Sequence, residues 1–329
     1  MISEAGTVTL AQLQAGLEPR LDQARNEIRR LIAADFQLIS DVNTHLLQMQ
    51  GKMFRPTLVF LVHDATGGND PRVVSLAAIV ELIHLATLVH DDSVDHSVLR
   101  RGMPTINALF SHQVSVIMGD YLYSRAVIEL VRLNDLAPLR VLSRVTNEMT
   151  VGEMRQLLAH DRLKFTEEEY DLLIRAKTAS LLSGAAEVGA LTASPGVREG
   201  MTRFGAYLGM AFQIIDDLLD FAESEAVTGK PSGLDLREHK VTLPLIHALP
   251  RMNDRQRARV SQLMATPEPP DDLIAEVIAD VTALGGLDYA RERAQQFIGK
   301  AQTELDRLAP SPARETLRAS LTYVLDRRR

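Results

Sequence analysis

Residues 82–95, LIHLATLVHDDSVD, and residues 209–221, GMAFQIIDDLLDF, contain the pattern that decides the fold of this chain. In both segments apolar residues at helical spacing accompany three aspartates in the arrangement D-D-x-x-D. Residues four positions apart project from the same face of a helix. The two segments therefore predict two helices that each carry a cluster of carboxylates: Asp91, Asp92 and Asp95 on the first, and Asp216, Asp217 and Asp220 on the second.

Helical spacing continues through the rest of the chain. In residues 271–284, Ile274, Val277, Val281 and Leu284 fall on one helical stripe, with two prolines before it and two glycines after it. No run of alternating β-branched residues between turn signals stands out, so we expect few strands. None of the loops is typical of a long flexible linker. The sequence predicts an all-α fold with a single domain, residues 1–329.

Composition and charge exclude several classes of protein. The chain has 329 residues, of which 46% are apolar, so it can bury a sizeable core. The net charge is −7, which opposes general binding of nucleic acid. There is no cysteine, which excludes disulfides and thiolate metal sites. We find neither a signal peptide nor about 18 uninterrupted apolar residues, so we expect a cytoplasmic protein with no transmembrane segment.

The aspartate clusters predict a metal site. Carboxylates that repel one another among buried apolar residues need a cation. With oxygen donors and no clear histidine pair, the expected ion is Mg²⁺, which bridges a few carboxylates to phosphate oxygens. A solvated acidic helix end is the alternative, and it suits one cluster better than two identical ones in apolar helices. An EF-hand is excluded because its glycine and distal glutamate are absent.

Basic residues flank both clusters where a diphosphate would need them. They are Lys52, Arg55, Arg100, Arg101, Lys177 and Lys230. The first two lie at an expected helix start next to Pro56, where the helix dipole favours an anion. Arginine binds phosphate through two donors and lysine acts as a compact charge. Together the carboxylates and the basic residues indicate a site for two diphosphates bridged by Mg²⁺.

These segments closely resemble the trans-isoprenyl diphosphate synthases, also called polyprenyl synthetases. The matching pieces run in consistent order from about residue 51 to residue 245: GKMFRP, ELIHLATLVHDDSVDHSVLRRGMPT, GDYLYSRA, GEMRQL, KTASL, FQIIDDLLDF and GKPSGLDLREHKVTLPLI. Residues 323–329 are similar to the family's basic tail. The resemblance implies a single bundle of long helices around a deep central cavity, the isoprenoid synthase type, and a homodimer.

The resemblance also implies roles for individual residues. It assigns the diphosphate of isopentenyl diphosphate to Lys52, Arg55, His84 and Arg101. It assigns the allylic diphosphate substrate to Arg100, Lys177, Thr178 and Gln213, and its leaving diphosphate to Lys230 and Lys240. It implies Mg²⁺ ligands at Asp91, Asp95, Asp216, Asp217 and Asp220, with Asp92 in support. Catalysis would depend on Asp91, Asp92, Asp95, Lys177, Asp216 and Asp217.

Four positions depart from the family's pattern. Met53 and Phe54 stand where the family often has Arg-Leu, and a glutamine rather than a second glycine precedes Gly51. His239 stands where glycine is usual. None of these changes removes a charge that the site needs, but the histidine bears on the geometry of its loop.

The implied activity is head-to-tail condensation of isopentenyl diphosphate with an allylic diphosphate by a prenyltransferase. Loss of the allylic diphosphate leaves a cation, and Mg²⁺ with the basic residues stabilises the departing anion. No strong side-chain base is visible, so the released diphosphate takes the final proton. A terpene cyclase and a non-catalytic partner subunit of a two-component synthase are the alternatives. A cyclase lacks the second substrate site, and partner subunits generally lose the aspartates.

The length of the product is predicted from Ala86 and Thr87. They precede Asp91 by five and four residues, about one helical turn beneath the diphosphate. Short-chain members of the family place an aromatic residue here. Small side chains let a growing tail run further down along the helix, at about 5.4 Å per turn. They predict a long-chain product of about six to ten isoprene units, of the kind used for quinone side chains. A farnesyl or geranylgeranyl diphosphate synthase is the alternative.

Further expectations concern the cavity floor and the assembly. The candidates for the floor are Leu142, Val145 and Met149. Residues 119–130 carry more large apolar and aromatic side chains than one helix face can bury, which predicts the homodimer interface. A peripheral contact with a membrane would help to release an apolar product.

Overall fold

The structure is a computed structural model that describes residues 8–49, 51–158, 162–222 and 233–327. Helices dominate it, as the sequence predicted. In the part of the chain that it describes, the strands are the short antiparallel pair β1 (Leu99–Arg100) and β2 (Met103–Pro104). A capping box of Thr9 and Gln12 starts the first helix.

The helices are named in chain order. The α-helices are α1 (Leu10–Gln14), α2 (Glu18–Ile32), α3 (Gln37–Gln48), α4 (Phe54–Ala65), α5 (Val73–Val94), α6 (Ile106–Leu109), α7 (His112–Arg132), α8 (Leu136–Leu158), α9 (Glu167–Ile174), α10 (Ser180–Gly189), α11 (Pro195–Ala222), α13 (Leu234–Arg237), α14 (Leu243–Ala248), α15 (Asp254–Ala265), α16 (Asp271–Ala283), α17 (Gly286–Leu305) and α18 (Pro312–Leu325). Short 3₁₀ turns are η1 (Arg162–Lys164) and η3 (Leu249–Arg251), and η2 (Arg175–Ala179) is a π-helical turn.

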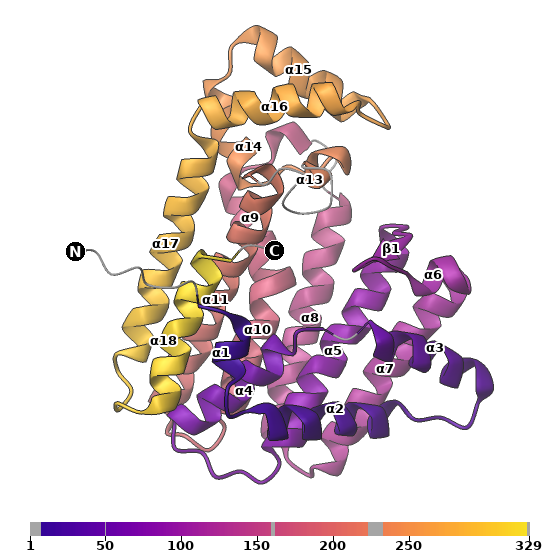
Figure 1. Cartoon of the computed structure of the whole chain (residues 1–329), viewed down its shortest axis with the longest axis vertical. Coiled ribbons are helices and arrows are strands. Elements are labelled where there is room, and N and C mark those ends of the chain that lie inside the picture. The colour runs from indigo at the N-terminus through magenta and orange to yellow at the C-terminus, as the bar shows by residue number, and fades with distance from the viewer. Residues whose placement is uncertain (1–7, 50, 159–161, 223–232, 328–329) are drawn as a thin grey trace.

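The two helices with aspartate clusters form the centre of the bundle. The 28-residue α11 packs against α10 and α17, and α5 packs against α2, α4 and α7. Figure 1 shows α15 and α16 lying across one end of the bundle and α2 lying near the other. The aspartates are in the last turns of α5 and α11, so both clusters lie at helix ends.

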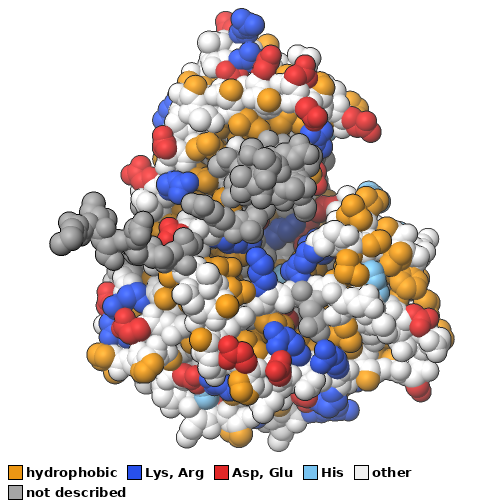
Figure 2. All heavy atoms as spheres, in the orientation of Figure 1, with side chains coloured by type: hydrophobic (Ala, Val, Ile, Leu, Met, Phe, Trp, Pro, Cys, Tyr) orange, Lys and Arg blue, Asp and Glu red, His pale blue; other side chains and the backbone are white. Residues whose placement is uncertain are grey.

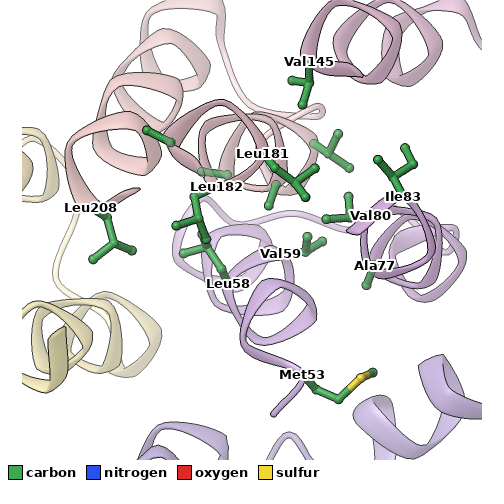
Figure 3. Close-up of a cluster of buried hydrophobic side chains, with 14 of the residues drawn as sticks. Met53, Leu58, Val59, Ala77, Val80, Ile83, Val145, Leu181, Leu182 and Leu208 are labelled. Atoms are coloured by element: carbon green, nitrogen blue, oxygen red, sulfur yellow. The ribbon is translucent and has the colours of Figure 1, made fainter. Parts of the chain in front are cut away.

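The main core joins α4, α5, α8, α10 and α11. Figure 3 shows Ile83 of α5, Val145 of α8 and Leu181 of α10 pointing into one shared region. All three side chains are buried. Close packing depends on Gly205, where a Cβ atom would lie 2.5 Å from the Leu182 carbonyl oxygen. A second, smaller cluster joins α14, α15 and α16. The single-domain organisation stays a prediction.

Helix α5 is also long and apolar enough to cross a membrane by length and composition, with a mean hydropathy of 1.9. This is weak evidence for a span, because 56% of the apolar window is buried inside the fold and a core helix of a bundle has the same composition.

Candidate active site

The three aspartates of α5 have different surroundings. Asp91 is half-buried, and burial raises its pKa to about 6, with Lys177 opposing the shift and Glu153 and Asp95 adding to it. Asp95 is exposed at the end of the helix. Asp91 and Asp95 are therefore carboxylates on one helix face whose charge a cation would relieve.

Asp92 has a supporting position. It is buried, and both of its carboxylate oxygens accept hydrogen bonds from Arg100 Nε, at 2.7 and 2.8 Å. The supporting role expected for Asp92 stays a prediction. The two bonds place the Arg100 guanidinium against the first cluster, next to the expected allylic diphosphate.

The three aspartates of the second cluster also have different surroundings. Asp217 is buried; its Oδ2 accepts a hydrogen bond from the Tyr170 hydroxyl at 2.6 Å and its Oδ1 accepts one from Gln213 Nε2 at 2.7 Å. Asp220 is buried and accepts hydrogen bonds from the backbone N–H groups of Leu234 and Asp235. Burial raises the pKa of Asp217 to about 7.

Asp216 is the most open member of the second cluster, with 42% of its side chain exposed. Its carboxylate lies 3.3 Å from Arg327 Nη1, in the basic tail. Burial raises the pKa of Asp235 on α13 well above its ordinary value. The nearby carboxylates of Asp217, Asp220 and Asp216 add to this shift. Asp235 is a fourth carboxylate of this cluster, which the D-D-x-x-D spacing did not reveal.

Lys177 and Thr178 lie in the π-helical turn η2. Lys177 Nζ is 2.7 Å from Glu153 Oε2 and donates a hydrogen bond to Gln156 Oε1 at 3.2 Å. The turn fits closely against α8, since a Cβ atom at Gly152 would lie 2.8 Å from Ala176 Cβ. π-helical turns frequently occur at functional sites. Glu153 was missed by the sequence analysis, although GEMRQL was among the matching pieces.

Lys240 lies between the two clusters. Burial opposes its charge, but Glu238, Asp235 and Asp95 together raise its pKa. Its Nζ is 2.6 Å from Glu238 Oε2. The neighbouring His239 has a φ of 58°, in the left-handed region that favours glycine, and its ring bonds to the Thr266 carbonyl oxygen at 2.8 Å. The loop thus keeps a glycine-like backbone with a histidine in place. Lys230 lies outside the described residues.

The residues expected to bind isopentenyl diphosphate form a cationic group. Burial, Arg327 and Arg101 lower the pKa of Lys52, and burial lowers the pKa of Arg55. Within the described part of the chain, Arg55 Nε is buried without a hydrogen-bond partner. Burial and Arg55 hold the pKa of His84 well below its usual range, so its imidazole is neutral at pH 7.

Glu81 is the carboxylate of this cationic group, and its place in the sequence alone did not mark it as a site residue. Burial raises its pKa, and Arg55 and Arg101 oppose the shift. A Cβ atom at Gly51 would lie 3.2 Å from Arg101 Nη1 and 3.3 Å from Glu81 Oε1, so glycine lets the loop approach both side chains. Cationic side chains thus outnumber carboxylates here, which suits a dianionic or trianionic ligand.

A pocket of about 50 Å³ borders the cationic group. Its lining residues include Gly51, Glu81, His84, Arg100, Arg101 and the apolar Leu85, Leu88 and Val89. Figure 2 shows lysine and arginine side chains around a hollow in the middle of one face. Ala86 and Thr87 do not line this pocket. Ala86 is buried, and Thr87 is half-buried with its hydroxyl bonded to the His84 carbonyl oxygen.

The expected floor residues Leu142, Val145 and Met149 are buried on α8. Of these, Val145 belongs to the region that Ile83 and Leu181 share in Figure 3. Tight packing at this level is evident from Gly184, where a Cβ atom would lie 2.7 Å from Val145 Cγ2. Buried side chains therefore pack closely between α8 and α10 at this level.

Among the described residues, no three acidic or histidine side chains converge into a ready-made cation site. The donor set is open: within the two clusters, Asp91, Asp95 and Asp216 keep side-chain exposure, whereas Asp92, Asp217 and Asp220 are buried. Mg²⁺ typically takes one or two carboxylates, several waters and substrate phosphates rather than an all-protein cage. The residues present fit an ion held in that manner.

Two carboxylate clusters at the ends of central helices, with basic side chains between and beside them, define an enzyme class that acts on diphosphates inside a helical bundle. The chain belongs to the polyprenyl synthetase family, whose model matches residues 36–281. This confirms the resemblance found in the sequence, and the chain is a prenyltransferase of that family.

The chain is similar over most of its length to named relatives. It is 38% identical to octaprenyl diphosphate synthase of Escherichia coli (strain K12) over 86% of this chain and 88% of the relative. It is 39% identical to all-trans-nonaprenyl-diphosphate synthase (geranyl-diphosphate specific) of Rhodobacter capsulatus over 93% and 94%. The structure of polyprenyl synthase from Caulobacter crescentus CB15, complexed with calcium and isoprenyl diphosphate, matches with a TM-score of 0.92, 30% identity, and 98% and 99% coverage.

Proposed function

We propose that the chain condenses isopentenyl diphosphate with an allylic diphosphate and releases a long-chain all-trans polyprenyl diphosphate. The observation that carries this function is the pair of carboxylate clusters, with Lys177 near Asp91 and Lys240 near Asp95 and Asp235, next to a separate cationic group. Two anion sites of different construction suit two diphosphate substrates. The names of the octaprenyl and nonaprenyl relatives support a long-chain product.

The described residues have distinct tasks in this reaction. Asp91, Asp95 and Asp216 would hold Mg²⁺, which when bound supplies Lewis-acid stabilisation of the departing diphosphate. The calcium in the Caulobacter crescentus relative supports binding of a divalent cation by this chain. Arg100, Lys177 and Lys240 add positive charge on the same side. Arg100 is fixed by its bonds to Asp92, so it needs no reorganisation as the charge develops.

The remaining site residues bind and orient the substrates. Lys52, Arg55 and Arg101 hold the diphosphate of isopentenyl diphosphate, and neutral His84 donates one N–H to it. The Thr178 hydroxyl oxygen and the Gln213 amide oxygen lie 2.7 Å apart beside Lys177, where the allylic cation needs an acceptor and no bulk water. The allylic C–O bond breaks, the double bond of isopentenyl diphosphate attacks, and the released diphosphate takes the proton.

Incubation of the purified chain with geranyl or farnesyl diphosphate tests this function. We expect a prenyl diphosphate product only when isopentenyl diphosphate and Mg²⁺ are both present. Hydrocarbon formed from the allylic diphosphate alone would indicate a cyclase instead. Inactivity of the chain alone, with activity restored by a second subunit, would indicate a two-component synthase.

The two anion sites can be separated by mutation. Lys52→Ala should raise the KM for isopentenyl diphosphate about tenfold, because it removes one charged contact to that substrate. Lys177→Ala should instead lower kcat and raise the KM for the allylic substrate. Steady-state kinetics with each substrate varied in turn measures both effects. An unchanged KM for isopentenyl diphosphate in Lys52→Ala would show that the two sites are assigned wrongly.

We propose a homodimer in which α7 faces its counterpart, as residues 119–130 predicted. Large apolar side chains are exposed along this helix: Ile117 is 64%, Ile128 42% and Val131 61% exposed. Leu99, Leu109 and Phe110 extend this apolar surface at the neighbouring hairpin and α6. Exposed apolar patches of this kind mark protein interfaces. Solution scattering at micromolar concentration should give twice the 36.4 kDa chain mass, and a monomer mass would contradict the proposal.

A further inference from the structure

Tyr170 contacts the second aspartate cluster from a helix that the family motifs do not include. It lies on α9, is 2% exposed, and donates its hydroxyl hydrogen to Asp217 Oδ2 at 2.6 Å. Nothing in the proposed reaction uses this phenol directly. Because this buried hydroxyl is bonded to a carboxylate of the site, its role depends on the other groups that Asp217 contacts.

The contact is the first link of a continuous chain of hydrogen bonds. Asp217 Oδ1 accepts from Gln213 Nε2 at 2.7 Å, and Gln213 Oε1 accepts from the Thr178 hydroxyl at 2.7 Å. The chain therefore runs from α9 through α11 to the π-helical turn. It ends on Thr178, next to Lys177.

The direction of each bond fixes the next one. Asp217 accepts through both of its oxygens, from the Tyr170 hydroxyl and from the NH₂ side of the Gln213 amide. The amide oxygen then faces Thr178 and accepts its hydroxyl hydrogen. Because Thr178 donates its hydroxyl hydrogen to Gln213, the lone pairs of Thr178 Oγ1 remain free to act as acceptors towards the cavity. The chain thus sets an acceptor beside the expected position of the allylic cation.

We propose that Tyr170 is a positioning residue that orients Thr178 as an acceptor through Asp217 and Gln213. The proposal rests on the proposed prenyltransferase function for its kinetic consequence, but the hydrogen-bond chain itself does not. Outer partners of this kind commonly set the orientation of the groups that touch the reacting atoms.

Another tyrosine of the protein offers a matched control for the test. The Tyr289 hydroxyl also donates to a carboxylate, Glu167, at 2.7 and 2.8 Å, and Glu167 lies on the same helix as Tyr170. Tyr289 is on α17 and contacts none of the aspartates in the two clusters among the interactions described. Tyr289→Phe therefore removes the same kind of bond outside the proposed chain.

Tyr170→Phe should lower kcat about ten- to hundredfold, the range for one hydrogen bond to a charged group, with the KM for isopentenyl diphosphate within twofold of wild type. Tyr289→Phe should keep kcat within twofold. Thr178→Val breaks the chain at its other end. If Tyr170 acts through Thr178, the double variant should be no slower than the slower single variant. Multiplicative losses, or a Tyr170→Phe kcat within twofold of wild type, would overturn the proposal.

A second measurement needs neither metal nor turnover. In protein labelled with ¹⁵N-glutamine, the side-chain NH₂ signal of Gln213 is assigned by its loss in Gln213→Leu. This signal should shift in Tyr170→Phe and stay in place in Tyr289→Phe. An unmoved signal in Tyr170→Phe would refute the proposed chain of hydrogen bonds, even if this variant folds and is fully active. A wild type that made no prenyl product would contradict the proposed function. The spectrum would still show whether Tyr170 orients Gln213 through Asp217.

Discussion

Asp91→Asn should lower kcat by several orders of magnitude, and Asp216→Asn should do the same. Each substitution keeps the shape of the side chain but removes a carboxylate that would hold Mg²⁺ against the departing diphosphate. Both aspartates have exposed side-chain surface, unlike Asp217 and Asp220, whose oxygens are bonded inside the protein. Initial rates at saturating substrates and Mg²⁺ measure the effect. More than about a tenth of wild-type activity would contradict the assignment.

Loss of folding must be separated from loss of chemistry in these variants. Burial raises the pKa of Asp91 to about 6 in the fold, so the ionised carboxylate opposes folding above that pH. Metal-free Asp91→Asn should therefore be at least as stable as wild type at pH 8. The advantage should disappear as the pH falls through 6 towards 4, because Asp91 is then neutral in wild type. Asp306→Asn, at the end of α17, is an exposed control that should keep full activity.

Ala86→Tyr should shift the product from a long chain to fifteen or twenty carbons. Ala86 is buried one turn before Asp91 on α5, so a ring there would lie across the path of a growing tail. The first condensation needs only the space near the diphosphate, and its rate should change little. Chromatography of the dephosphorylated products measures the distribution. A wild type that stops at fifteen carbons would refute the long-chain proposal.

A tyrosine at a fully buried alanine can also disturb packing. Thr87→Tyr is a second variant for the same purpose, since Thr87 is half-buried at the same level of α5. Ala283→Tyr adds the same ring at an exposed position at the end of α16 and should leave the products unchanged. If neither Ala86→Tyr nor Thr87→Tyr changes the products, the length is not set at this level of α5.

Local sequence determined the helices and the placement of the carboxylates. Periodicity of apolar residues depends on neighbours within two turns, so α5, α11 and α16 follow from their own residues. The spacing D-D-x-x-D likewise places Asp91 beside Asp95 on any helix. Motif spacing also identified the family, because the motifs are contiguous pieces of the chain. These features need no knowledge of what packs against each helix.

Only the tertiary structure decided what each carboxylate does. Two identical motifs end in different surroundings: Asp92 is held by Arg100 eight residues away, whereas Asp217 is held by Tyr170 from 47 residues away. Glu81 and Glu153 join the site for the same reason, since helices that are distant in sequence bring them to Arg101 and Lys177. Burial and hydrogen bonding arise between elements, so a pattern within one element cannot encode them.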